Sequence, residues 1–170
     1  MTPAAAAASS GRHPQRLARR AEPLMVPRPL PGDPGLIVVD ATWGQINPVE
    51  LAPGVRTVGE VEVIAHLEAG RPLVDSRPVH AYAAQTLPGA TNLPHSEVEP
   101  RLNQLDPDVE TVFFCNGPQC AASPDAIRSL LGRSYPAKSI LYYRGGLHDW
   151  LTLGLPVAAP AWQRQEEAAG

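Results

Sequence analysis

The sequence contains few cysteines and no long hydrophobic run. It has two cysteines in 170 residues, Cys115 and Cys120, too few for a disulfide-based scaffold or a four-cysteine zinc site. No apolar run approaches the ~20 residues that a membrane-spanning helix needs. The basic residues near the N-terminus are not followed by the apolar segment of a secretory signal. The sequence therefore favours a soluble protein of a reducing, cytoplasmic compartment that does not bind membranes.

Aromatic residues and excess charge are also scarce. Aromatic residues make up 5% of the chain and the net charge is −3. Because no strongly basic surface is expected, we do not expect a nucleic-acid partner. Hydrophobic residues nevertheless reach 44%, so the chain is long enough and apolar enough for one domain with a core of aliphatic side chains.

The composition changes along the chain and predicts four segments. Residues 1–34 hold seven of the twenty prolines and are predicted to form a disordered or extended arm rich in proline, alanine and arginine. The sequence names no protein partner for this arm. Residues 35–55 carry large apolar side chains among turn formers and are predicted to be an ordered N-terminal extension. Residues 56–157 form the predicted domain, and residues 158–170 a tail.

Within the predicted domain, helical and strand patterns alternate. Thr111–Phe114 consists of four strand formers without polar alternation, which is typical of a central strand in a parallel sheet. Such alternation predicts an α/β fold with a mainly parallel sheet, whose site lies at the carboxyl ends of the strands. The patterns predict helices over 58–69, 79–85, 98–105, 123–133 and 147–153, and strands over 72–75, 90–93, 111–114 and 139–143.

Cys115 stands directly after the predicted central strand. A loop with glycine and proline follows it, and a predicted helix begins a few residues later. Free backbone N–H groups and the helix dipole at such a position stabilise a thiolate and lower the pKa of a cysteine from about 8.5. Cys115 is therefore a candidate nucleophile. The alternative is a structural cysteine buried in the core.

The loop from Cys115 to Cys120, with the sequence CNGPQC, resembles the active-site loop of rhodanese-like domains, and in particular of the subgroup with CNGPxC. Three further segments resemble motifs of the same family in the same order: LVDSR at 73–77, LPGATNLP at 87–94 and YRGGLHDW at 143–150. The resemblance implies a three-layer α/β fold, with a central, mainly parallel five-stranded sheet flanked by helices.

The resemblance also implies a sulfurtransferase without a metal or an organic cofactor. Cys115 would take a sulfane sulfur from a small donor such as thiosulfate, as a persulfide, and pass it to a thiophilic acceptor such as cyanide or a thiol. Asp75 and Arg77 would support the loops around the site or contact the substrate directly. Backbone amides would hold the charged sulfur, and the residues that supply them are Asn116, Gly117, Gln119, Cys120 and Ala121.

The loop departs from the commonest family pattern at two positions. The family's loop has an arginine five residues after the catalytic cysteine, where this chain has Cys120, and its glycine comes one residue later than Gly117. The loop itself thus supplies no cationic side chain beside the sulfur. Cys120 is interpreted as an inert residue, as a second thiol that forms a disulfide with Cys115, or as a thiol that passes sulfur onward.

Three other functions were compared with sulfur transfer. Phosphatases and arsenate reductases of the related fold need an arginine six residues after the nucleophile, where this chain has Ala121, so the sequence disfavours that class. A non-catalytic, regulatory or sulfur-carrying module remains an alternative. A thiol–disulfide redox protein that uses Cys115 and Cys120 is another.

Overall fold

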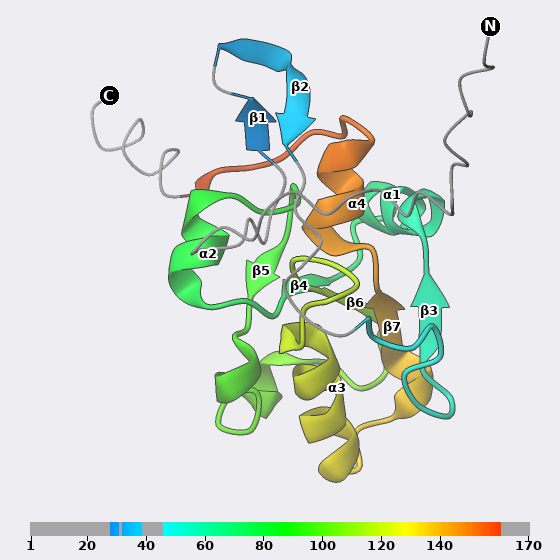
Figure 1. The fold of residues 1–170 in the computed structure, drawn as a ribbon. Coiled ribbons are helices and arrows are strands. Elements are labelled where there is room, and N and C mark those ends of the chain that lie inside the picture. The colour runs from blue at the N-terminus through cyan, green and yellow to red at the C-terminus, as the bar shows by residue number, and fades with distance from the viewer. Residues whose placement is uncertain (1–27, 31, 39–45, 161–170) are drawn as a thin grey trace, which may run out of the picture.

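Five parallel strands form the central sheet of the computed structural model, which describes residues 28–30, 32–38 and 46–160. The strands lie in the order β3-β7-β6-β4-β5, and every neighbouring pair is parallel, as Figure 1 shows. The predicted α/β class and the five-stranded sheet are confirmed. The strands are β3 (Arg56–Val58), β4 (Leu73–Asp75), β5 (Thr91–Asn92), β6 (Thr111–Phe114) and β7 (Ile140–Tyr143).

The three inner strands end level with one another. Phe114, the last residue of β6, pairs with Asp75 of β4 on one side and with Tyr143 of β7 on the other. Because parallel strands share one carboxyl edge, the residues that follow β4, β6 and β7 leave the sheet side by side. Cys115 is the residue that follows the middle strand.

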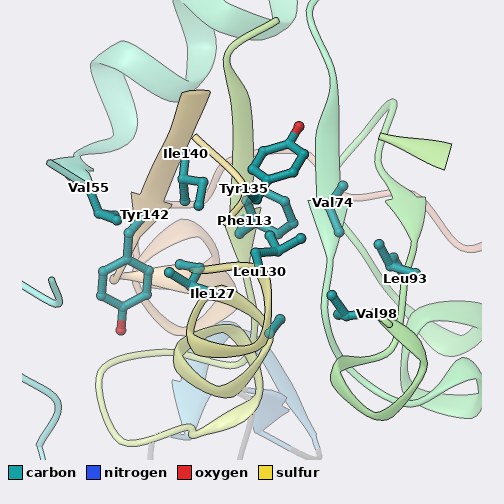
Figure 2. Close-up of a cluster of buried hydrophobic side chains, with 11 residues drawn as sticks. Val55, Val74, Leu93, Val98, Phe113, Ile127, Leu130, Tyr135, Ile140 and Tyr142 are labelled. Atoms are coloured by element: carbon teal, nitrogen blue, oxygen red, sulfur yellow. The ribbon is translucent and has the colours of Figure 1, made fainter. Parts of the chain in front are cut away.

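Helices cover both faces of the sheet and complete three layers. One face packs against α3 (Ala122–Gly132), whose Ile127 and Leu130 are fully buried beneath Phe113 of β6 (Figure 2). The other face packs against α1 (Glu60–Glu68), α2 (Val79–Ala84) and α4 (Gly146–Thr152). Successive residues of β6 and β7 alternate between the two clusters, as the period of a strand requires.

Two local predictions are wrong. The helix predicted over 98–105 is absent; the short 3-10 turn η1 (His95–Glu97) precedes the segment, and a second, η2 (Leu102–Gln104), lies within it. Pro100 lies in this segment, and a proline inside a helix removes a donor and clashes with the preceding turn. The helix predicted from Val58 begins at Glu60, because Val58 ends strand β3. A third 3-10 turn, η3 (Ala137–Ser139), precedes β7.

Strands β1 (Arg28–Leu30) and β2 (Asp33–Val38) form a separate antiparallel hairpin, drawn in blue in Figure 1. The hairpin occupies the end of the predicted arm and the start of the predicted extension, while residues 1–27 lie outside the described residues. At the other end, Ala158 pairs with Thr86, and the tail from 161 onward is not described. No helix in the described ranges is long and apolar enough to cross a bilayer.

Candidate active site

Cys115 lies at the floor of a tight loop between β6 and α3. Its side chain is 2% exposed. The N–H of Cys120 donates to the carbonyl of Gly117 at 3.0 Å, which folds the loop back on itself. The same fold places the carbonyl oxygen of Cys120 at 3.6 Å from Sγ of Cys115. Residues five positions apart in the sequence therefore face one another across the loop.

The first turn of α4 holds the loop from one side. The N–H groups of Leu147 and His148 donate to the carbonyls of Cys115 and Asn116, at 3.1 Å and 2.7 Å. Gly146 makes this close approach possible. It has a φ of +56°, and a Cβ on it would overlap the carbonyl of Cys115, so the position requires glycine on both grounds. The second glycine of the motif YRGGLHDW therefore supports the loop directly.

Asn47, from the predicted N-terminal extension, holds the loop from another side. Its N–H donates to the carbonyl of Pro118 and its Nδ2 to the carbonyl of Cys120, both at 2.7 Å. Its own carbonyl accepts a bond from Nε of Arg144 at 2.9 Å. The sequence reasoning missed Asn47, because no local pattern links it to a loop 73 residues away.

Asp75 and Arg77 form a buried ion pair beside the loop. Nε and Nη2 of Arg77 donate to the two carboxylate oxygens of Asp75 at 2.9 Å and 2.6 Å. The side chain of Arg77 is 3% exposed and that of Asp75 is 0% exposed. Thr86 donates its hydroxyl to the same carboxylate at 2.8 Å. Nη1 of Arg77 reaches the loop itself and donates to Oδ1 of Asn116 at 3.2 Å. The pair therefore joins the end of β4 to the loop after β6.

These contacts fix the orientation of the loop's peptide groups. The carbonyls of five loop residues have donors: those of Cys115 and Asn116 from α4, that of Gly117 from within the loop, and those of Pro118 and Cys120 from Asn47. The N–H and C=O of a trans peptide point to opposite sides, so the carbonyl of Cys115, held by α4, directs the N–H of Asn116 away from α4. The N–H groups of Asn116 and Ala122 hydrogen-bond the sulfur of Cys120. The loop therefore has the form of an anion-binding nest.

The electrostatics of the two thiols differ from the sequence prediction. Burial, reinforced by the neighbouring Cys120, raises the pKa of the Cys115 thiol, although the N–H and hydroxyl of Ser123 oppose this rise. The pKa of Cys120 is lowered to about 6, first by its hydrogen bond with Cys115 and then by the amides of Ala122 and Asn116, against the effect of burial. The prediction of a lowered pKa at Cys115 in the reduced protein is therefore wrong.

The cation beside the sulfur comes from outside the loop. The positive charge of Arg77 also lowers the pKa of Cys120, so the arginine missing from the loop is partly replaced by one that follows β4. The N–H of Cys120, predicted to hold a bound sulfur, instead donates to Gly117. The structure brings all the predicted site residues into this region: Asp75, Arg77, Cys115, Asn116, Gly117, Gln119, Cys120 and Ala121. Among the described residues, no group of three or more histidine, cysteine or acidic side chains could hold a metal ion.

The parallel sheet, the cysteine loop and the ion pair beside it are consistent with the family that a comparison with known proteins identifies. A model of the rhodanese-like domain matches residues 60–153, which is more than half of the chain. The chain therefore belongs to the rhodanese-like domain family. Asn47 lies before the matched residues, so part of the support of the loop comes from outside the region that this family shares.

Three similar proteins give the family context. A helix-turn-helix type transcriptional regulator of Mycobacterium tuberculosis is 36% identical over 101 residues, which cover 59% of this chain and 43% of the regulator. A sulfurtransferase of Allochromatium vinosum is 32% identical over 88 residues, covering 52% and 78%. The crystal structure of a thiosulfate sulfurtransferase from Pseudomonas aeruginosa superposes with a TM-score of 0.55 at 25% identity, covering 65% and 21%. The chain thus spans less than half of the regulator's length.

Proposed function

We propose that this protein is a sulfurtransferase that carries a sulfane sulfur on Cys115, from a small donor such as thiosulfate to a thiophilic acceptor. The observation that carries the proposal is a buried cysteine in a loop whose backbone is held by α4 and Asn47, and in which the N–H groups of Asn116 and Ala122 face a sulfur. Preorganised N–H groups of this kind stabilise a charged sulfur at no cost of rearrangement. The family membership and the similar sulfurtransferase of Allochromatium vinosum support the same chemistry.

In the first half-reaction, the sulfur of Cys115 attacks the outer sulfur of thiosulfate. The sulfur–sulfur bond of the donor breaks, sulfite leaves with the bonding electrons, and Cys115 becomes a persulfide. Cys115 loses its proton to solvent in this step, so the second thiol of the loop is not required for it. In the second half-reaction, the acceptor takes the outer sulfur. Because both thiols are buried, we expect small donors and acceptors. Because the reaction uses free thiols, we expect a reducing compartment such as the cytoplasm.

The first half-reaction is tested by the sulfite it releases. Reduced protein is mixed with thiosulfate, and sulfite is measured for wild type, Cys115→Ser and Cys120→Ser. One sulfite per chain from wild type and from Cys120→Ser, with none from Cys115→Ser, is the expected result. Both replacements are nearly isosteric, and thermal unfolding verifies that each variant is folded. No sulfite from folded wild type, or equal sulfite from Cys115→Ser, would overturn the proposal.

A second candidate function is a regulatory module that senses sulfane sulfur without turning it over. The similarity to a transcriptional regulator favours it. The two functions differ in turnover. An enzyme converts many equivalents of thiosulfate and cyanide to sulfite and thiocyanate, whereas a sensor loads once and stops. Steady-state thiocyanate formation by wild type therefore separates them.

A further inference from the structure

Sulfur transfer through Cys115 gives the second thiol of the loop no chemical role. Cys120 is 6% exposed, as deeply placed as many core residues, and with Cys115 and Ala122 it forms a small buried cluster at the base of the loop. Both cysteines are free thiols. A side chain that only fills space there needs no hydrogen-bond donors. Cys120, however, has several.

The sulfur of Cys120 lies in a buried cluster with Cys115 and Ala122 at the base of the loop. It accepts hydrogen bonds from the N–H groups of Asn116 and Ala122 and hydrogen-bonds the thiol of Cys115. The positive charge of Arg77 is close enough to favour its anion. These are the surroundings of a reactive thiolate, and the nearest group with which it can react is the sulfur of Cys115.

We propose that Cys120 resolves the Cys115 persulfide by forming an intramolecular Cys115–Cys120 disulfide and releasing hydrogen sulfide. This inference rests on the proposed function, which supplies the persulfide. It adds a second outcome to that function, because the protein then reduces a sulfane sulfur to sulfide at the expense of its own two thiols.

The step balances without any further oxidant. The thiolate of Cys120 attacks the inner sulfur, Sγ of Cys115, and forms a new sulfur–sulfur bond. The bond between Sγ and the outer sulfur breaks, and the outer sulfur leaves with its electron pair as hydrosulfide. The sulfane sulfur is reduced, and the two cysteines are oxidised together. A dithiol reductant is then needed to restore the thiols.

The geometry of the loop suits this attack. The turn that joins the N–H of Cys120 to Gly117 and the contact of 3.6 Å between Sγ of Cys115 and the carbonyl of Cys120 already fold the two residues together. Two hydrogen-bonded thiols must approach to about 2.05 Å to form a disulfide. Hydrosulfide is also a good leaving group, because its conjugate acid is more acidic than an ordinary thiol, and a lower thiol pKa speeds departure.

The experiment measures sulfite, sulfide and mass together, under anaerobic conditions with thiosulfate as the donor. For wild type we expect one sulfite and one sulfide per chain, and an intact mass two hydrogens below that of the reduced protein. For Cys120→Ser we expect one sulfite, no sulfide, and a stable gain of one sulfur atom that cyanide removes. Cys120→Ala serves as a second variant, and wild type without donor controls for air oxidation.

The outcomes separate this inference from the proposed function. If wild type releases sulfite but keeps the added sulfur as long as Cys120→Ser does, the inference is wrong and the sulfurtransferase stands. If no sulfite forms, the proposed reaction with thiosulfate fails, and the proteins are loaded with glutathione persulfide instead. In that case a disulfide in wild type and a persulfide in Cys120→Ser support the inference, while persulfides in both overturn it.

Discussion

Strand β6 and the loop that follows it are adjacent in the chain but are held in place in different ways. Every residue of β6 is buried, and the strand lies between β4 and β7, with apolar side chains of α3 on one face and of α4 on the other. The loop is held by directional polar contacts from Asn47, Arg77 and the first turn of α4. The strand thus depends on burial and the loop on orientation, so changes in the two regions have different consequences.

The largest expected effect comes from removing apolar volume beneath the strand. Leu130 is fully buried in α3, and Leu130→Ala is expected to lower the free energy of unfolding by about 2–5 kcal/mol through lost burial and a cavity. Urea unfolding measures this loss. Leu153→Ala is the matched control, because Leu153 is 62% exposed and a change there stays within about 0.5 kcal/mol. An equal loss in the two variants would contradict the burial argument.

The difference between strand and loop also explains how much could be predicted from the sequence. The apolar run of Thr111–Phe114 and the amphipathic pattern of α3 depend on nearby residues, and both were predicted within a residue of their observed bounds. The position of Cys115 at the end of β6 follows from the same local pattern.

The supports of the loop could not be predicted in the same way. Asn47 contacts the loop through the fold alone, from 73 residues away. The lowered pKa was predicted for Cys115 but is found at Cys120. This difference depends on which sulfur accepts hydrogen bonds from the N–H groups of Asn116 and Ala122. A sequence records the presence of two cysteines in the loop, but which sulfur the loop's N–H groups face depends on contacts between segments far apart in the chain.

The next largest effect is expected at the ion pair that joins β4 to the loop. Arg77→Met leaves the fully buried carboxylate of Asp75 without its guanidinium, and breaking a buried pair from one side costs about 3–5 kcal/mol, of which hydrogen bonds from Thr86 and water recover part. We therefore expect Arg77→Met to lower the free energy of unfolding by as much as Leu130→Ala does, or by somewhat less. We also expect the molecules that remain folded to release sulfite more slowly.

The control for Arg77 is an arginine of the surface. Arg56 pairs with Glu110 while 63% exposed, so Arg56→Met is expected to change the free energy of unfolding by less than about 1 kcal/mol. It should leave sulfite release unchanged. If Arg77→Met and wild type have the same midpoint of urea unfolding, the buried ion pair does not stabilise the protein as the structure indicates.

Replacing Asn47 is expected to change the free energy of unfolding less, but to change the pKa of Cys120 as well. Asn47→Asp keeps the shape but removes the Nδ2 donor to Cys120, and losing one such bond costs about 1–3 kcal/mol. The new carboxylate also lies near the Cys120 thiolate, so the pKa of Cys120 rises. Alkylation by iodoacetamide as a function of pH detects this rise. Asn103→Asp, at an exposed position, should leave the alkylation profile unchanged, and an identical shift there would point to net charge rather than position.

The smallest expected effect is the dependence of stability on pH, and it distinguishes the two thiols. The pKa of Cys120 is about 6 in the folded protein against a reference of 9.0, so between these values the unfolded chain binds more protons than the folded one. Stability therefore rises with pH across this window and is lost as the pH falls through about 6. The raised pKa of Cys115 acts with the opposite sign, but only above its unfolded value near 9. The free energy of unfolding of wild type in urea should therefore rise by about 1 kcal/mol from pH 6 to pH 7 relative to Cys120→Ser, whereas parallel profiles would show that the loop's donors do not hold a thiolate at Cys120.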